Sequence, residues 1–122
     1  MIAAIADTHT VIWYLFSDER LGRAASALIE STIANGDHIG VSAISFAKMV
    51  YLIEKDRIQA TPNSVLQASS AYRSGRVSMR GIPRHEIPDL PDRIIAATAR
   101  LHDVPVLSRD GRIRASIVQT IW

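Results

Sequence analysis

The stretch Ile87–Asp110, IPDLPDRIIAATARLHDVPVLSRD, constrains the fold most, because it predicts a helix followed directly by a strand. Asp89 has the residue type and position of a helix N-cap. Pro91 is tolerated in the first turn, where its missing N–H would have no partner within the helix. Asp92 then stands at the third helical position, where the helix dipole favours a negative charge. We therefore expect a helix that begins near Asp89 and carries a carboxylate in its first turn.

The body of this predicted helix is apolar on nearly all sides, which indicates burial within the protein. Its apolar positions are Ile94, Ile95, Ala96, Ala97, Ala99 and Leu101. The helix should end near His102, and Val104–Leu107 is an apolar run typical of a short strand. Ser108–Gly111 breaks that run as a turn and places Asp110 just after the strand. The carboxyl ends of strands are where open parallel sheets bind their ligands.

The rest of the chain alternates between strands and helices. We expect strands at Ile2–Ala6, His38–Ser42 and Ile117–Ile121, the last with Trp122 at a sheet edge. We expect helices at Val11–Phe16 with Thr8 or Thr10 as N-cap, at about Gly22–Asn35, and after an N-cap at Ser45 with its end in the charged residues Glu54–Arg57. This order predicts an α/β fold with a mainly parallel sheet covered on both faces.

The segment Gln59–Pro83 has no clear period because Pro62, Gly75 and Gly81 interrupt it. The preferred interpretation is a strand at 65–71 and a weak helix at 74–81. The competing interpretation is a single helix at 62–73.

Length and composition favour one soluble domain over residues 1–122. The chain has 122 residues, 48% of them hydrophobic, and no run of 18 apolar residues that would span a membrane. No basic segment precedes the first apolar run, so a secretory signal is not expected. The absence of cysteine excludes disulfides and thiolate metal sites and fits a cytoplasmic protein. Of 14 basic residues, 12 are arginine, which suits phosphate contacts and allows a nucleic-acid partner.

Three carboxylates are candidates for a shared site. Asp7 and Asp110 follow predicted strands, and Asp92 opens a helix at the same end of the sheet. Clustered carboxylates repel one another unless a hard divalent cation such as Mg²⁺ or Mn²⁺ lies among them. Such a metal would generate hydroxide and stabilise a phosphoryl group during hydrolysis. The alternative is that each aspartate is only a turn or cap residue.

Four motifs together resemble the PIN-domain ribonucleases of the VapC toxin type, and the likeness runs over nearly the whole chain. They are DTHTVIW at Asp7–Trp13, VSAISFAKMVYLIEKDRI at Val41–Ile58, DLPDRIIAATA at Asp89–Ala99 and SRDGRI at Ser108–Ile113. The resemblance implies a three-layer α/β/α sandwich and a Mg²⁺- or Mn²⁺-dependent endoribonuclease. It also implies a toxin of a type II toxin–antitoxin system, with RNA as substrate, a VapB-like antitoxin as partner, and a homodimer.

The same resemblance implies a catalytic site of four acidic residues, three of which match Asp7, Asp92 and Asp110. The fourth is a glutamate shortly after the SAIS motif, and in this chain Lys48 stands there. Glu54 does not easily replace it, because a residue six positions further along a helix points its side chain away from the face that carries Lys48. We therefore expect impaired metal binding and cleavage. The alternative is a non-catalytic PIN scaffold that binds an antitoxin or RNA.

Four further polar residues are candidates for substrate binding because they flank the acidic positions: Thr8, Arg93, Ser108 and Arg109. Each also has a simpler explanation as a cap, turn or surface residue. The histidines lack the spacing of a zinc site. Trp13 is expected to pack its helix rather than to stack on bases.

Overall fold

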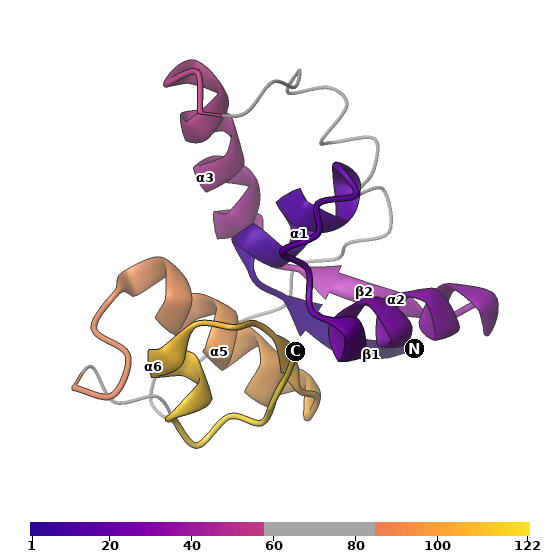
Figure 1. Ribbon diagram of the computed structural model, residues 1–122. Helices are drawn as coiled ribbons and strands as arrows, with labels where there is room; N and C mark the ends of the chain where they lie inside the picture. Colours follow the sequence, from indigo (N-terminus) through magenta and orange to yellow (C-terminus); the bar gives the residue numbers. More distant parts are fainter. Residues whose placement is uncertain (58–84) are drawn as a thin grey trace.

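The computed structural model describes residues 1–57 and 85–122 (Figure 1). The strand expected at 65–71, the helix expected at 74–81 and the competing helix at 62–73 lie outside the described residues.

A parallel sheet forms the middle of the molecule. Its strands are β1 (Ile2–Ala6), β2 (His38–Val41), β3 (Val106–Leu107) and β4 (Thr120–Ile121), in the order β2-β1-β3-β4. Ile5 of β1 is in register with Gly40 on one side and with Val106 on the other, and every described pairing is parallel. All four strands therefore end at the same edge of the sheet, and the residues that follow them meet there.

Five helices surround this sheet in the described part of the chain. They are α1 (Thr8–Leu15), α2 (Arg23–Ala34), α3 (Ala43–Glu54), α5 (Leu90–His102) and α6 (Gly111–Arg114). None of the described helices has the length and apolar character needed to cross a membrane.

Alternate residues of the strands face opposite layers, as the period of a strand requires. Ile5 and Val106 belong to a core with Ile95 and other residues of α5. Ala4, Ala6 and Leu107, their neighbours along the strands, belong to a second core with Ala25 and Ile29 of α2. The sheet thus has a helical layer on each face, which confirms the predicted α/β fold with a parallel sheet.

A third core joins α1 to α3 beside the sheet (Figure 1). Ile12 and Trp13 of α1 pack with Met49 of α3, and Trp122 at the chain's end packs against the same group. Trp122 also passes close to Gly22, where an added Cβ would lie 2.5 Å from the Trp122 carbonyl carbon. This packing fixes α1 and α3 relative to each other at the edge where the strands end.

Two expected N-caps were wrong. Asp7, rather than Thr8 or Thr10, caps α1 by accepting from the Thr10 N–H. Ser42, rather than Ser45, caps α3, so this helix begins three residues earlier than expected. In both places more than one polar residue suitable as a cap stands within three positions, and the turn of the chain out of the strand selects the earliest of them.

The C-terminal region also differs from the expectation. The last strand covers only Thr120–Ile121 rather than Ile117–Ile121. Asp110 does not lie in a plain turn but caps α6. Leu101, expected to be buried with the rest of its helix, is 50% exposed in the last turn of α5. The predicted start of α5 is confirmed, with Asp89 accepting from the Asp92 N–H.

Candidate active site

Asp7 is held rigidly where β1 gives way to α1. Its side chain is buried, and Oδ1 accepts a hydrogen bond of 2.8 Å from the Thr10 N–H. Oδ2 accepts from the hydroxyl of Ser108, the residue that follows β3. The Thr10 hydroxyl donates to the Leu107 carbonyl at 2.6 Å and so ties α1 to the same strand. The neighbouring strand ends thus fix one carboxylate in one orientation.

Ser108 links two of the predicted acidic residues. It is fully buried, its hydroxyl donates to Asp7, and its Oγ accepts from the Asp110 N–H at 3.0 Å. Oδ1 of Asp110 then accepts from the N–H groups of Arg112 and Ile113 at 2.9 and 3.0 Å. The structure therefore brings Asp7 and Asp110 together through a single buried hydroxyl.

Asp92 completes the acidic group from the first turn of α5. Burial and, after it, the carboxylates of Asp89, Asp110 and Asp7 together raise the pKa of Asp92 to about 6, while Lys48 acts in the opposite direction. Asp92 therefore lies within electrostatic range of Asp7, Asp110 and Lys48. Sequence reasoning treated Asp89 only as a cap and did not expect its repulsion of Asp92.

Lys48 reaches this cluster from the inner face of α3. Ser45, one turn earlier, is fully buried and accepts from the Thr8 hydroxyl at 3.1 Å. Met49 is fully buried against α1. Residues three and four apart share a helix face, so Lys48 lies on the same side as Ser45 and beside Met49. Its side chain is half-buried. Position 48 therefore faces α1 and the end of β1.

The donor set as it stands does not fit Mg²⁺ or Mn²⁺. Within residues 1–57 and 85–122, no three His, Cys, Asp or Glu side chains form a group that could hold a metal ion. Both oxygens of Asp7 accept hydrogen bonds within the protein, and a lysine stands at the position where the resemblance implies a carboxylate. An ammonium donates hydrogen bonds but offers no lone pair to a cation.

The four predicted substrate-binding residues have different environments. The Thr8 and Ser108 side chains are buried, and their hydroxyls are hydrogen-bonded to Ser45 and Asp7. These contacts hold the two hydroxyls in place at the carboxyl edge of the sheet. Arg93 follows Asp92 in α5 and is half-buried, whereas Arg109 is exposed.

A pocket of about 330 Å³ opens at the carboxyl edge of the sheet. Its lining residues are Asp7, His9, Trp13, Arg20, Arg109 and Asp110. Sequence reasoning missed Arg20 and assigned Trp13 to packing alone. No sequence signal connects Arg20 with Asp7, because the two residues meet only through the fold of the link between α1 and α2.

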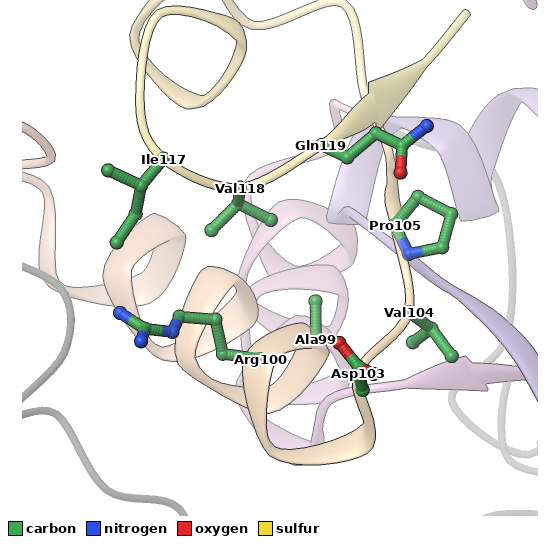
Figure 2. A pocket seen from close by; sticks show the side chains of 8 residues that line it. All are labelled: Ala99, Arg100, Asp103, Val104, Pro105, Ile117, Val118 and Gln119. Carbon is green, nitrogen blue, oxygen red and sulfur yellow. The ribbon is translucent and has the colours of Figure 1, made fainter.

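A second pocket, of about 540 Å³, lies where β3 begins (Figure 2). Its lining residues are Ala99, Arg100, Asp103, Val104, Pro105, Ile117, Val118 and Gln119. Val104 and Pro105 precede β3, so this pocket lies at the edge opposite the acidic cluster. It has a single carboxylate, that of Asp103, and it is larger than the acidic pocket without sharing its chemistry.

The fold and this acidic edge define the class of protein. The chain belongs to the PIN-domain family, whose family model matches residues 4–116. It is similar to Ribonuclease VapC22 of Mycobacterium tuberculosis (strain ATCC 25618 / H37Rv), with 30% identity over 124 residues that cover 94% of this chain and 92% of the relative.

A solved structure described as a toxin-antitoxin complex from Klebsiella pneumoniae is also similar. The likeness has a TM-score of 0.62 at 24% identity and covers 98% of this chain and 97% of that chain. At this identity the likeness shows the fold.

Proposed function

We propose that this chain is a VapC-type endoribonuclease toxin of a type II toxin–antitoxin system that hydrolyses RNA phosphodiesters at the Asp7–Asp92–Asp110 cluster. The observation that carries the proposal is that Asp7 and Asp110 are joined through the buried Ser108 hydroxyl, with Asp92 close enough for both carboxylates to raise its pKa. Such mutual repulsion has a simple use if a cation or an electrophile is bound there. Membership of the PIN family and similarity to a protein named a ribonuclease support this choice.

We propose that the complete site is dependent on Mg²⁺ or Mn²⁺, held by the three aspartates and a carboxylate at position 48. When bound, the metal would supply a hydroxide and stabilise charge on the phosphoryl group. The chain's own contribution is to orient the ligands: Ser108 and Thr10 hold Asp7, and α6 holds Asp110. Arg93 and Arg109 are the proposed contacts for the RNA backbone.

Lys48 impairs this site in the chain as it stands. A lysine in place of glutamate changes the formal charge of the four-residue cluster from about −4 to about −2 and removes an oxygen ligand. At an effective dielectric of about 20 and a separation of about 4 Å, each Lys–Asp pair attracts by about 4 kcal/mol before desolvation. The ammonium therefore takes over part of the cation's electrostatic role without its chemistry.

The test is single-turnover cleavage of a labelled RNA with Mg²⁺ and with EDTA. We expect little or no cleavage by the parent and metal-dependent cleavage by Lys48→Glu. Asp7→Asn or Asp92→Asn in the Lys48→Glu background should abolish it again. Lys48→Gln is the matched control, since it removes the cation without adding a carboxylate. A parent that cleaves as fast as Lys48→Glu would refute the missing-ligand argument.

The second candidate function is a non-catalytic PIN scaffold that binds an antitoxin or RNA, and Lys48 is the observation that favours it. In that case Lys48→Glu gains neither metal-dependent cleavage nor metal binding. The two candidates therefore give opposite results in the same assay.

We further propose that the chain acts in the cytoplasm as a homodimer and binds a VapB-like antitoxin. Leu15 and Phe16 at the end of α1 and Tyr51 on α3 are exposed apolar side chains on neighbouring helices. These side chains are the proposed contacts with a partner chain. Sedimentation velocity of the parent should show a dimer at micromolar concentration, and Phe16→Asp should shift it to monomer. A parent that stays monomeric would contradict the dimer.

A further inference from the structure

Two guanidinium groups lie over the indole of Trp13. The Cζ atom of Arg20 is 5.0 Å from the centroid of the Trp13 ring, and that of Arg109 is 4.7 Å away. Arg20 belongs to the link between α1 and α2, and Arg109 to the loop between β3 and α6. Both distances are within the range in which a cation is attracted by an aromatic ring. One ring thus gathers two cations from distant parts of the sequence.

The indole is a fixed support for these arginines. Trp13 is only 4% exposed, and its ring meets that of Trp122 edge-on at a centroid distance of 5.6 Å. Trp122 in turn packs directly against the backbone at Gly22, where a side chain would not fit. The support is therefore organised before any ligand binds.

Arg20 is also fixed along one edge of its guanidinium. Nε donates to Oδ1 of Asp18 at 3.0 Å, and Nη2 donates to Oδ2 at 2.8 Å. A guanidinium carries five N–H donors, so the Nη1 hydrogens and one Nη2 hydrogen are not used by this pair. Arg109, for its part, forms no ion pair with any residue of 1–57 or 85–122. Both arginines therefore retain donors for a ligand.

The arginines share a pocket with two carboxylates. Arg20 and Arg109 line the same cavity as Asp7 and Asp110. An anionic ligand that approaches the carboxylates is repelled unless cations on the cavity wall offset them. Arginine suits a phosphate better than lysine does, because its planar fork donates two parallel hydrogen bonds. The chemistry of the wall therefore favours a phosphodiester.

We propose that Arg20 and Arg109, supported by Trp13, form an anion clamp that binds a backbone phosphate of single-stranded RNA beside the acidic cluster. The inference rests on the proposed function and adds to it the contact that positions the substrate. Arg20 and Arg109 are binding residues in this scheme, and Trp13 and Asp18 are positioning residues.

The competing explanation is structural: Arg20 covers Trp13 and closes the link between α1 and α2. That explanation predicts a loss of stability in Arg20→Gln with no change in RNA affinity. The clamp predicts a loss of RNA affinity in Arg20→Gln and in Arg109→Gln alike. Thermal unfolding and RNA binding measured on the same samples separate the two.

The test is fluorescence anisotropy of a labelled 12-nucleotide mixed-sequence RNA in EDTA, over a range of salt concentrations. Each of Arg20→Gln and Arg109→Gln should weaken binding about tenfold, which is what the loss of one charge-assisted hydrogen bond brings. Each should also reduce the slope of log affinity against log salt by about 0.7, the value for one phosphate contact on a single strand. Arg57→Gln, a matched loss of an exposed arginine after α3, should change affinity less than about twofold.

The role of Trp13 is tested without altering the core. Arg20→Lys and Arg109→Lys keep the charge but lose the planar group that lies on the ring. We expect both lysine variants to keep the parent's slope of log affinity against log salt and to bind the RNA about threefold more weakly. Lysine variants that bind RNA as tightly as the parent would show that positive charge alone is enough for binding, and would overturn a clamp that depends on Trp13.

An unchanged RNA affinity in both glutamine variants would overturn the proposal, and an acidic protein would then be the ligand to test for these arginines. Because binding is measured in EDTA, the result does not depend on cleavage. Loss of affinity in the glutamine variants with no cleavage by Lys48→Glu would refute the nuclease and keep the clamp. Cleavage by Lys48→Glu with unchanged affinity in the glutamine variants would support the nuclease and refute the clamp.

Discussion

Replacing Asp92 by asparagine should stabilise the folded protein at pH 8 but not at pH 4. The pKa of Asp92 is raised to about 6, first by burial and then by the carboxylates of Asp89, Asp110 and Asp7, whereas Lys48 lowers it. The same side chain in the unfolded chain titrates near 3.9, so the folded state holds the proton more tightly. The Asp92 contribution to the free energy of unfolding therefore falls as the pH rises from about 4 to about 6.

The size of the effect follows from this shift. A shift of about two units corresponds to about 3 kcal/mol, and solvent screening at this half-exposed side chain reduces it to about 1–2 kcal/mol. Asparagine is neutral at every pH, so it avoids the free-energy cost of an ionised carboxylate at position 92 in the folded protein. The difference in the free energy of unfolding between Asp92→Asn and the parent should thus be near zero at pH 4 and about 1–2 kcal/mol at pH 8.

The assay is urea unfolding in EDTA, followed by the fluorescence of Trp13 and Trp122. Glu19→Gln is the matched control, since it removes an exposed carboxylate from the link between α1 and α2. In the Lys48→Glu background the gain from Asp92→Asn at pH 8 should be larger, because the lysine that opposes the pKa rise has been replaced by another carboxylate. A gain that is equal at pH 4 and pH 8, or larger at pH 4, would refute the clustering of charges around Asp92.

Two further predictions concern stability. Ser108→Ala should lower the free energy of unfolding by about 1–3 kcal/mol because it removes the donor to Oδ2 of buried Asp7. Ser31→Ala on the exposed face of α2 should change it by less than about 0.5 kcal/mol, and equal losses in urea unfolding would argue against the Ser108 link. Asp103 ends α5 with φ 53° and ψ 48°, so Asp103→Gly should raise stability by about 0.5 kcal/mol and Asp103→Ala should lower it. Thermal unfolding that shows the same sign for both would contradict the left-handed cap.

Local chemistry explains why parts of the fold were predictable from sequence. Asp89 and Pro91 mark the start of α5 because capping and the missing proline N–H act within a single turn. Asn35 and Gly36 end α2 for a similar reason, with Gly36 at φ 76°. By contrast, the caps at Asp7 and Ser42 depend on how the chain leaves a strand, which neighbouring residues alone do not determine.

The acidic site was predictable in its members but not in its support. That Asp7 and Asp110 lie together follows from parallel strands ending at one edge. Ser108 was predicted only as a substrate-binding residue, and the link that its buried hydroxyl makes between these aspartates was not predicted. The burial of Ser108 depends on the loop around it, which the sequence does not determine. The meeting of Arg20 and Arg109 over Trp13 is a tertiary contact between distant segments, and no spacing in the sequence indicates it.

In the proposed function, Lys48 stands where a carboxylate would complete a metal site with Asp7, Asp92 and Asp110. The most direct measurement is a calorimetric titration of the parent, Lys48→Gln and Lys48→Glu with Mn²⁺ at pH 7.5. We predict that Lys48→Glu binds one Mn²⁺ per chain, at least about tenfold more tightly than either of the others, and that adding Asp110→Asn removes this binding. Equal Mn²⁺ affinity in the parent and Lys48→Glu would contradict the claim.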